Sequence, residues 1–309
     1  MSPQWSNLIR FVSGGRDYYG DAILSSDKTA DDVVDLAKSS KLRARVVEDD
    51  PLTVGKVSQK ELLVETLLAP LTKAQVPVIR CIGLNYVKHS TCLRLKPPKA
   101  DIDPCVVEEV GRNPPTYPPL FIKPSTSLAG YKQDVRVPKL AQKTTDYEGE
   151  LTIVIGKSAR DIPESEALDH VAGYVVSNDV SCREWQKDRA FGPAGGQWCF
   201  SKGFDDWAPI GPVVVSPKVL RDASSLNLTT MVNGEMKQHS NTSDLLFGVK
   251  KLVAFCSQGT TLETGSLIMT GTPSGVVSGM ENQVFLKDGD VVHVKIDGLG
   301  SISNVMKFV

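Results

Sequence analysis

Three carboxylates alternate along one short stretch of this 309-residue chain. Asp146, Glu148 and Glu150 occupy every second position of the string DYEGE, which runs directly into the apolar string LTIVI. A period of two places the three acids on one face of a strand, where they repel one another. Divalent cations that prefer carboxylate oxygens, namely Mg²⁺, Ca²⁺ or Mn²⁺, relieve such repulsion. Taken alone, the spacing is more typical of a solvated strand face. Other parts of the sequence are needed to choose between that interpretation and a metal site.

Short apolar runs that could hold this segment in a sheet follow one another from Val78 onward. Gly, Pro and Asn separate them, and they predict strands at Val78–Ile82, Leu120–Ile122, Leu151–Ile155, Val171–Ser177, Val213–Val215, Leu226–Val232, Ser266–Thr270 and Val291–Ile296. Helices are expected at Glu164–Leu168 and at Thr242–Cys256, which is amphipathic. Because strands and helices do not alternate regularly, the order predicts an α+β, mostly β fold with an antiparallel or mixed sheet.

The first 75 residues have the pattern of a separate small lobe. Two strands joined by a Gly-Gly turn, a helix capped by Thr29 and a short helix or buried strand are expected there, at Ile9–Val12, Tyr18–Ile23, Thr29–Lys38 and Glu61–Leu68. We therefore predict a small N-terminal domain over residues 1–75 and a larger domain over residues 76–309, which is compatible with the length of the chain.

Composition narrows the class of protein. A net charge of −1 with scattered basic residues argues against nucleic acid as a partner. No apolar stretch approaches the roughly 18 residues of a membrane span, and the start of the chain lacks a signal-peptide pattern. None of the six cysteines lies in a Cys-x-x-Cys pair or has zinc-site spacing, which is typical of reduced thiols. A cytoplasmic location is therefore expected, with mitochondria as the alternative.

Eight collinear strings give the chain a family resemblance. They are CIGLNYVKH (81–89), FIKPSTSLAG (121–130), DYEGELTIVIGKSAR (146–160), SNDVSCREWQ (177–186), QWCFSKGFDDWAPIGP (197–212), VNGEMKQHSNTSDLLF (232–247), TGTPSGV (270–276) and LKDGDVVHVKIDGLGSISN (286–304). Together they resemble the fumarylacetoacetate hydrolase family, in its branch of small metal-dependent hydrolases, decarboxylases and isomerases. The resemblance is strong over residues 76–309 and loose over residues 1–75.

The resemblance implies a mixed β-sandwich roll for the catalytic domain and a homodimer. It also implies a bound Mg²⁺, with Ca²⁺ or Mn²⁺ in some members, and small anionic dicarbonyl or 2-oxo acid substrates. Glu148, Glu150 and Asp179 match the metal-binding carboxylates, while Asp146 lies beside that set. Lys202 matches a lysine that binds substrate or stabilises developing negative charge. Four further positions match substrate-binding residues: Lys123, Arg183, Gln186 and Thr272.

His89 matches the general base of the family, but its usual partner is displaced. A glutamate normally follows the histidine by three residues, whereas this chain has Cys92, and Glu109 restores the pattern only after an irregular insertion at about residues 90–107. Three explanations are open. The insertion is a lid and Glu109 still reaches His89, it removes the water-activating pair, or it derives from a retained short intron. Glu108 replaces Glu109 if the register is shifted by one.

The sequence as a whole predicts a Mg²⁺-dependent enzyme that cleaves a C–C bond in a small β-dicarbonyl or 2-oxo acid. Hydrolysis of an acylpyruvate or fumarylacetoacetate needs a water activated by His89 and Glu109. Decarboxylation of an oxaloacetate-like acid needs only the metal, Lys202 and controlled protonation. Two alternatives stay open: an isomerase of an unsaturated hydroxy-dioate, and a metal- and ligand-binding relative with an impaired His–Glu pair.

Overall fold

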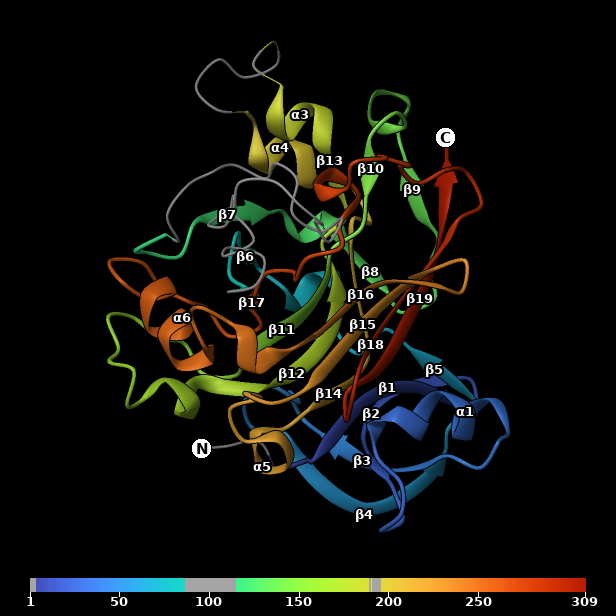
Figure 1. The fold of residues 1–309 in the computed structure, drawn as a ribbon. Coiled ribbons are helices and arrows are strands. Elements are labelled where there is room, and N and C mark those ends of the chain that lie inside the picture. Colours follow the sequence, from blue (N-terminus) through green and yellow to red (C-terminus); the bar gives the residue numbers. More distant parts are fainter. Residues whose placement is uncertain (1–3, 87–114, 189, 191–195) are drawn as a thin grey trace.

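A large mixed sheet runs through the molecule. The computed structural model describes residues 4–86, 115–188, 190 and 196–309 (Figure 1). Ten strands of the large sheet form one hydrogen-bonded path, while β5 (Thr66–Leu68) pairs with β1 and β8 (Leu128–Gly130) pairs with β14. In path order the ten are β4 (Lys56–Leu63), β3 (Arg43–Glu48), β2 (Arg16–Ile23), β1 (Asn7–Ser13), β14 (Ala208–Val215), β12 (Val171–Asn178), β11 (Gly149–Ile155), β17 (Leu267–Met269), β6 (Ile79–Ile82) and β7 (Leu120–Lys123).

A smaller, five-stranded sheet packs against the large one. Its strands, in order, are β16 (Glu235–Asn241), β15 (Asn227–Val232), β18 (Val291–Ile296), β19 (Gly300–Phe308) and β9 (Val135–Val137). A separate pair of two-residue strands joins β10 (Thr145–Asp146) to β13 (Ser181–Cys182). Parallel pairing of β6 with β17, β8 with β14 and β9 with β19 makes both sheets mixed. The predicted mostly β, mixed-sheet fold is confirmed.

The two central strands β11 and β12 are buried along their whole length. Leu151 and Ile153 belong to the core cluster that includes the smaller sheet, and β11 contacts β15 and β18. Val154, one position out of phase, belongs to a second cluster on the opposite face. This burial on both faces explains why the sequence there is continuously apolar instead of alternating. It also fixes the register of this strand, which begins at Gly149 between Glu148 and Glu150.

The helices of the described residues are short: α1 (Val33–Lys38), α3 (Arg183–Lys187), α4 (Trp198–Lys202), α5 (Pro217–Leu220) and α6 (Val249–Cys256). The single helix predicted at Thr242–Cys256 is wrong, because a 3-10 turn at Thr242–Asp244 precedes α6 and the chain between them is not helical. The Asn85 side chain accepts from Phe247 N (2.7 Å) and donates to Phe247 O (3.0 Å), so this backbone is paired outside any helix. The helix expected at Glu164–Leu168 is a 3-10 turn at Ala167–His170.

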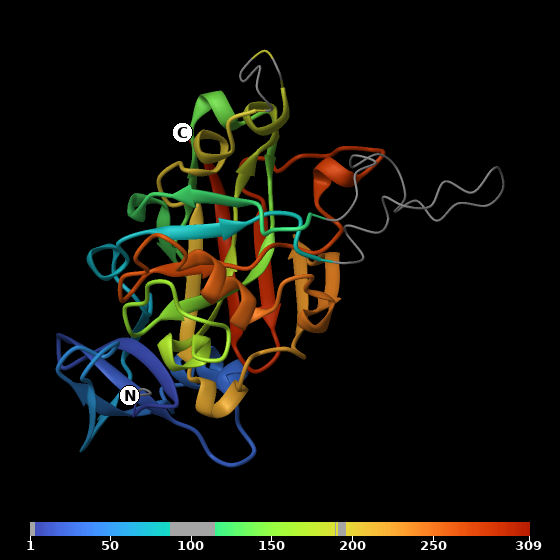
Figure 2. The same ribbon diagram turned by 90° about the vertical axis from the view of Figure 1, so that its left-hand side faces the viewer.

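The N-terminal strand pair and the helix capped by Thr29 are confirmed. The segment Glu61–Leu68 is not a helix; it belongs to strands β4 and β5, which are separated at Val64 and Glu65. Strand β1 pairs with β14, so β1–β4 continue the large sheet at the lower end of the molecule (Figure 2). The boundary between two domains near residue 75 stays a prediction.

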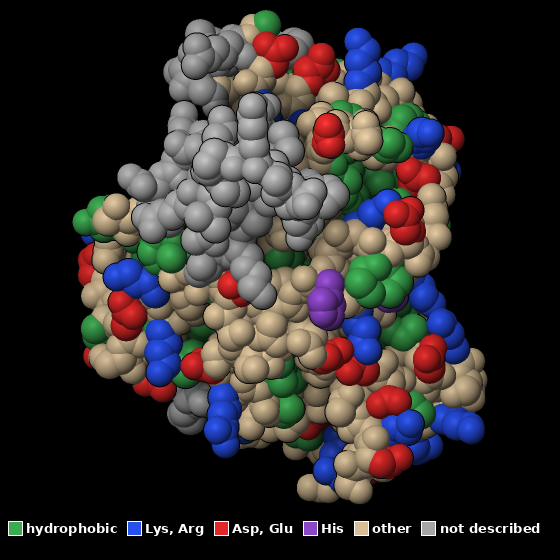
Figure 3. Space-filling model, in the orientation of Figure 1, with side chains coloured by type: hydrophobic (Ala, Val, Ile, Leu, Met, Phe, Trp, Pro, Cys, Tyr) green, Lys and Arg blue, Asp and Glu red, His purple; other side chains and the backbone are tan. Residues whose placement is uncertain are grey.

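The surface carries charges of both signs. On the face shown in Figure 3, Lys and Arg side chains are interspersed with Asp and Glu over the described part of the chain. Among the described residues, no helix combines the length and the apolar character that crossing a membrane requires. The predictions of a homodimer, of a cytoplasmic location and of no nucleic-acid partner stay predictions.

Candidate metal centre

The pairing of β11 with β12 brings the three predicted metal carboxylates together. Glu150 is the second residue of β11, Glu148 directly precedes the strand, and Asp179 directly follows β12. The backbone N–H of Asp179 donates to the carbonyl of Glu148 at 2.8 Å, which closes the end of the ladder. One oxygen from each carboxylate lies within 4.8 Å of the other two, and all three side chains are buried. The solvated strand face suggested by spacing alone is therefore wrong.

Lys202 supplies a cation to two of these carboxylates. Its ammonium at the end of α4 lies 2.9 Å from Glu148 Oε2 and 2.6 Å from Asp179 Oδ2. The residue is only 1% exposed, so the ordinary fate of a lysine on the surface does not apply. The Nζ atom also lies 4.9 Å from the centre of the Phe121 ring, which covers the ammonium with an apolar face.

Lys123, at the end of β7, has a different position. Its side chain is completely buried, and its Nζ lies 2.6 Å from Asp179 Oδ1. The same ammonium donates to the carbonyls of Val180 (3.1 Å) and Trp207 (2.6 Å). The two carbonyls thereby hold the Lys123 ammonium against the Asp179 carboxylate. Direct contact between Lys123 and a substrate stays a prediction of the resemblance.

Arg183 and Gln186 share one face of α3, as predicted from their spacing, and both are buried. Arg183 Nη1 donates to Gln186 Oε1 at 2.8 Å and lies 2.6 Å from Glu148 Oε1. The Nη2 atom of Arg183 has no hydrogen-bond partner among the described residues. A buried, unpaired N–H group beside the carboxylates offers a donor to an anionic ligand.

Asp146 does not share a strand face with Glu148 and Glu150, so this part of the prediction is wrong. It lies on β10, which pairs with β13, and β11 begins only at Gly149. Its carboxylate accepts from Arg183 Nε at 2.8 Å. It also accepts from three backbone N–H groups, those of Tyr147, Val277 and Ser278. Asp146 therefore orients Arg183 toward Glu148, and its place beside the metal set agrees with the prediction.

The cations of the cluster compensate Glu148 more than Glu150, and the pKa values of the two carboxylates shift in opposite directions. Burial raises the pKa of Glu148, but the Lys202 and Arg183 cations outweigh burial and hold this pKa at about 2. Burial, followed by the neighbouring carboxylates of Asp179 and Glu148, raises the pKa of Glu150 well above its ordinary value. Burial lowers the pKa of Lys202, yet Asp179 and Glu148 outweigh it and the net shift is upward. Glu150 is thus the carboxylate with the least compensation in the cluster.

The loop after β17 closes the cluster on the side of Glu150. The backbone N–H of Gly271 donates to Glu150 Oε2 at 2.7 Å. Thr272, predicted as a substrate-binding residue, donates its hydroxyl to the carbonyl of Gly149 at 3.0 Å. Gln238, from the smaller sheet, donates to that hydroxyl at 2.8 Å. Sequence reasoning missed Gln238, although it lies inside the string VNGEMKQHSNTSDLLF that carried part of the resemblance.

The predicted general base His89, its partner Glu109 with the alternative Glu108, and the insertion at 90–107 lie outside the described residues. Among the described residues, Asn85 Nδ2 donates to Thr270 O at 2.8 Å, directly before the Gly271 N–H that binds Glu150.

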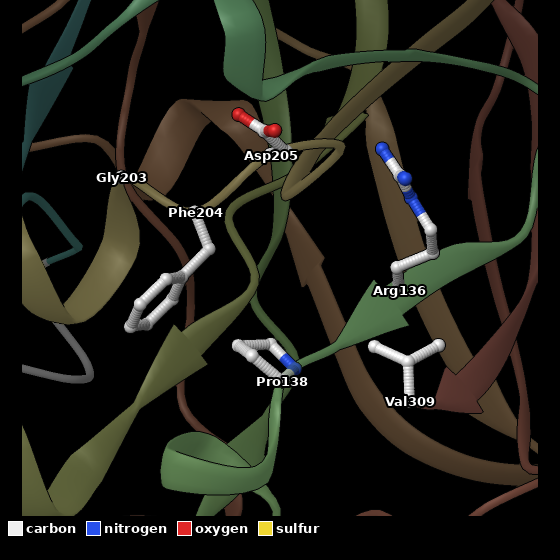
Figure 4. Close-up of a pocket in the computed structure, with 6 residues that line it drawn as sticks. All are labelled: Arg136, Pro138, Gly203, Phe204, Asp205 and Val309. Carbon is white, nitrogen blue, oxygen red and sulfur yellow. The ribbon is translucent and has the colours of Figure 1, made fainter.

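A pocket of about 370 Å³ lies elsewhere on the described surface (Figure 4). It is lined by Arg136, Pro138, Gly203, Phe204, Asp205 and Val309. None of the predicted site residues lines it, although Gly203 follows Lys202 in the chain. It is therefore not the metal centre.

The donor set fits a hard divalent cation. Three buried carboxylates offer oxygen ligands, and Glu150 accepts a single backbone hydrogen bond among the described residues. Oxygen-only ligation with room for further ligands is the usual environment of Mg²⁺, Ca²⁺ or Mn²⁺. Glu148, Glu150 and Asp179 are the residues that would hold the ion.

Comparison with known proteins agrees with this centre. The family model described as fumarylacetoacetate (FAA) hydrolase C-terminal matches residues 78–307. The chain is 40% identical over 239 residues to a mitochondrial oxaloacetate tautomerase of Xenopus laevis, covering 77% of this chain and 67% of that protein. It is 35% identical over 317 residues to the caffeoylpyruvate hydrolase of Neonothopanus nambi, covering 99% and 95%.

Among solved structures, the 2-hydroxyhepta-2,4-diene-1,7-dioate isomerase of Mycobacterium marinum superposes with a TM-score of 0.73 and 29% identity, covering 98% of each chain. A fumarylacetoacetate hydrolase of Exiguobacterium antarcticum gives a TM-score of 0.69 and the same identity. The family match spans most of the chain, and both curated relatives exceed 30% identity over at least two thirds of it. This protein belongs to the fumarylacetoacetate hydrolase family.

Proposed function

We propose that the chain is a Mg²⁺-dependent enzyme that cleaves a C–C bond in a small β-dicarbonyl 2-oxo acid. One observation carries the proposal: a buried lysine ammonium lies within 2.6–2.9 Å of two of three clustered carboxylates. Cleavage of such a bond leaves an electron pair on carbon as an enolate. A fixed cation in a site of low dielectric stabilises charge that develops only in the transition state.

The residues divide this work between binding and charge stabilisation. Arg183 holds an unpaired buried N–H group for a substrate carboxylate, and Asp146 keeps its guanidinium in that orientation. Lys202 is placed to stabilise the enolate oxygen. A divalent cation held by Glu148, Glu150 and Asp179 supplies Lewis-acid polarisation of the 2-oxo acid when bound.

Hydrolysis is the form of cleavage that we favour. Water adds to the acyl carbonyl of an acylpyruvate, the C–C bond breaks, and its electron pair passes to the pyruvate enolate, which is then protonated on carbon. The products are a carboxylic acid and pyruvate. The Neonothopanus relative, which matches almost the full length of the chain, is named a caffeoylpyruvate hydrolase, and this supports the choice. Water activation by His89 and Glu109 is part of the proposal.

Enolisation without cleavage is the second candidate. The described part of the site contains the groups that stabilise an enolate, whereas the proposed water-activating pair is separated by the unusual 20 positions between residues 89 and 109. Two relatives are named for such chemistry, an oxaloacetate tautomerase and a hydroxy-dioate isomerase. Decarboxylation of oxaloacetate would use the same groups.

Product analysis with purified protein and Mg²⁺ separates these reactions. An acylpyruvate and oxaloacetate are offered in parallel to the wild type, to Glu148→Ala and to Glu263→Ala, which removes an exposed acid close to β17. Pyruvate plus a carboxylic acid, formed by the wild type and Glu263→Ala but not by Glu148→Ala, supports hydrolysis. Carbon dioxide released faster than by Mg²⁺ alone identifies a decarboxylase, and enol–keto exchange of oxaloacetate that is faster than without protein and gives no products identifies a tautomerase. No turnover of either acid contradicts the proposal.

A further inference from the structure

Gln238 connects the two sheets at the metal centre. It lies on β16, and only 1% of it is exposed. Its Oε1 accepts from Gly149 N at 3.0 Å, and its Nε2 donates to Thr272 Oγ1 at 2.8 Å and to Pro273 O at 2.9 Å. Both ends of the amide are therefore engaged. A buried amide with three bonds to two separate backbone segments is costly to replace.

The bonds of Gln238 converge on the residue that links two metal carboxylates. Gly149 lies between Glu148 and Glu150; its N–H binds Gln238, and its carbonyl accepts the Thr272 hydroxyl at 3.0 Å. The ladder between β11 and β17 has ended by this point, since its last pair joins Thr152 to Met269. Beyond that pair, side chains replace the backbone hydrogen bonds. The Gln238 amide binds the N–H of the Glu148–Gly149 peptide group, and the Thr272 hydroxyl binds the carbonyl of the Gly149–Glu150 peptide group.

Two glycines near these bonds are packed so closely that no side chain fits there. A Cβ atom on Gly149 would lie 2.2 Å from Thr230 Oγ1, so only glycine allows β15 to approach so closely. Gly275 has φ +102°, and a Cβ there would lie 2.1 Å from the carbonyl of Lys237. The loop of residues 271–275 is therefore pressed against β16 beside Gln238. Small movements of the smaller sheet must be transmitted to this loop and to Gly149.

We infer that Gln238 is a positioning residue that sets the relative orientation of Glu148 and Glu150 through Gly149. The inference rests on the proposed metal site. It also assigns the Thr272 hydroxyl, whose proton goes to Gly149 and whose oxygen accepts from Gln238. The single proton of this hydroxyl is therefore not available to a ligand carboxylate. Partners outside the direct ligands of a metal typically change its affinity about 10- to 100-fold.

The test compares Gln238→Leu with Thr230→Ser in the full chain. Both changes lie in the same buried layer, but serine keeps the oxygen that faces Gly149 and removes only a methyl group, and Thr230 Oγ1 has no hydrogen-bond partner among the described residues. The first measurement is the dissociation constant of Mn²⁺ by electron paramagnetic resonance, without substrate. The second is hydrogen exchange around the Gly149 amide in metal-free protein. Gln238→Leu should weaken Mn²⁺ binding about tenfold and speed exchange, while Thr230→Ser should change neither.

Wild-type Mn²⁺ affinity and slow exchange in a folded Gln238→Leu variant would overturn the inference. If that variant does not fold, Thr272→Val and Thr272→Ser replace it, because valine breaks the bridge to Gly149 and serine keeps it. Weaker binding in the valine variant alone supports the inference, and equal binding in both overturns it. Wild-type protein that binds Mn²⁺ but turns over no substrate contradicts the proposed function and leaves the inference about Gln238 unchanged. Wild-type protein that binds no Mn²⁺ contradicts both.

Discussion

A cluster of buried acids and one isolated buried acid are compensated in opposite ways in this molecule. At the metal centre, Glu150 is surrounded by other carboxylates, and its bonded partner among the described residues is a backbone N–H. Asp206, a single acid that is 1% exposed, instead receives two cations, Arg136 at 2.7 Å and Lys73 at 3.1 Å. Because Asp206 has more cations than it needs for neutrality, its role is structural: it joins Arg136 on β9 to Lys73 in the turn at Lys73–Gln75. We call Asp206, Arg136 and Lys73 the clasp. At the candidate metal centre the cations Lys202, Lys123 and Arg183 contact Glu148 and Asp179, whereas Glu150 forms no ion pair among the described residues, and this arrangement is compatible with a bound cation.

Glu150→Gln is expected to have the largest effect. Loss of one carboxylate ligand should weaken Mg²⁺ binding about a hundredfold or more. In metal-free protein the same change should raise the free energy of unfolding at pH 8, because glutamine mimics the neutral acid that burial and the neighbouring Asp179 and Glu148 favour. Calorimetric titration with Mg²⁺ and thermal melts in chelator measure the two effects.

The pH dependence of that gain follows from the raised pKa of Glu150. The stabilisation contributed by its proton is complete below the ordinary value of 4.5 and is lost as pH rises through the raised value. The advantage of Glu150→Gln should therefore grow from pH 5 to pH 8. A constant difference across this range would mean that Glu150 is not the uncompensated acid.

Lys202→Met should lower kcat/KM about 10²- to 10³-fold, because it removes the cation proposed to stabilise the enolate. Mg²⁺ affinity should increase, since Glu148 and Asp179 lose their competing ammonium. Steady-state kinetics and calorimetry separate the two expectations. Lys157→Met, which removes an exposed lysine just after β11, is the matched control. Weaker Mg²⁺ binding in Lys202→Met would contradict the proposed division of roles.

Asp206→Asn should destabilise the fold by about 1–2 kcal/mol and leave turnover at 25 °C unchanged, since the clasp lies outside the metal centre. Burial opposes ionisation of Asp206, but hydrogen bonds from Arg136 and Lys73 outweigh burial and lower its pKa. Its contribution is therefore present above the ordinary value of 3.8 and is lost as pH falls through the lowered value. Chemical denaturation at pH 7 and pH 3 should show a difference between wild type and variant at pH 7 that shrinks at pH 3.

Lys73→Met should have the smallest effect, less than about 1 kcal/mol, because its side chain is 48% exposed and Arg136 still binds Asp206. Denaturation at low and high salt checks this expectation. An effect as large as that of Asp206→Asn would show that Lys73, and not the buried acid, determines the strength of the clasp.

The candidate metal carboxylates were predicted from the family resemblance, because local rules alone favoured a solvated strand face. Two local expectations do agree with the structure: Glu148 and Glu150 alternate at the start of β11, and Asp179 ends the apolar run that pairs with this strand. Asp146 does not follow the alternation, because β10 pairs with β13 and ends at Asp146, before β11 begins at Gly149. Such a break depends on pairing with β13, which no local pattern encodes.

Gln238 and the interrupted helix before α6 show the same limit. Gln238 is one polar residue in a hairpin strand, and its importance comes from the approach of a second sheet. The helix at Val249–Cys256 begins later than predicted. The reason is that Asn85, more than 150 positions earlier in the chain, hydrogen-bonds the backbone N–H and carbonyl of Phe247. In both cases a distant polar side chain decides the local outcome, which tertiary context routinely does.

The position of β17 determines when during synthesis this site can form. Only three residues long, it lies between β11 and β6 and pairs in parallel with a strand almost 190 positions earlier. Until Leu267–Met269 have been synthesised, β6 and β7 cannot join the sheet beside β11, and the strand that brings Lys123 close to Asp179 is missing. Contacts of such long separation form slowly. A truncation before residue 267 should therefore leave β6 and β7 without the strand that joins them to the large sheet, and their unpaired edge should promote aggregation.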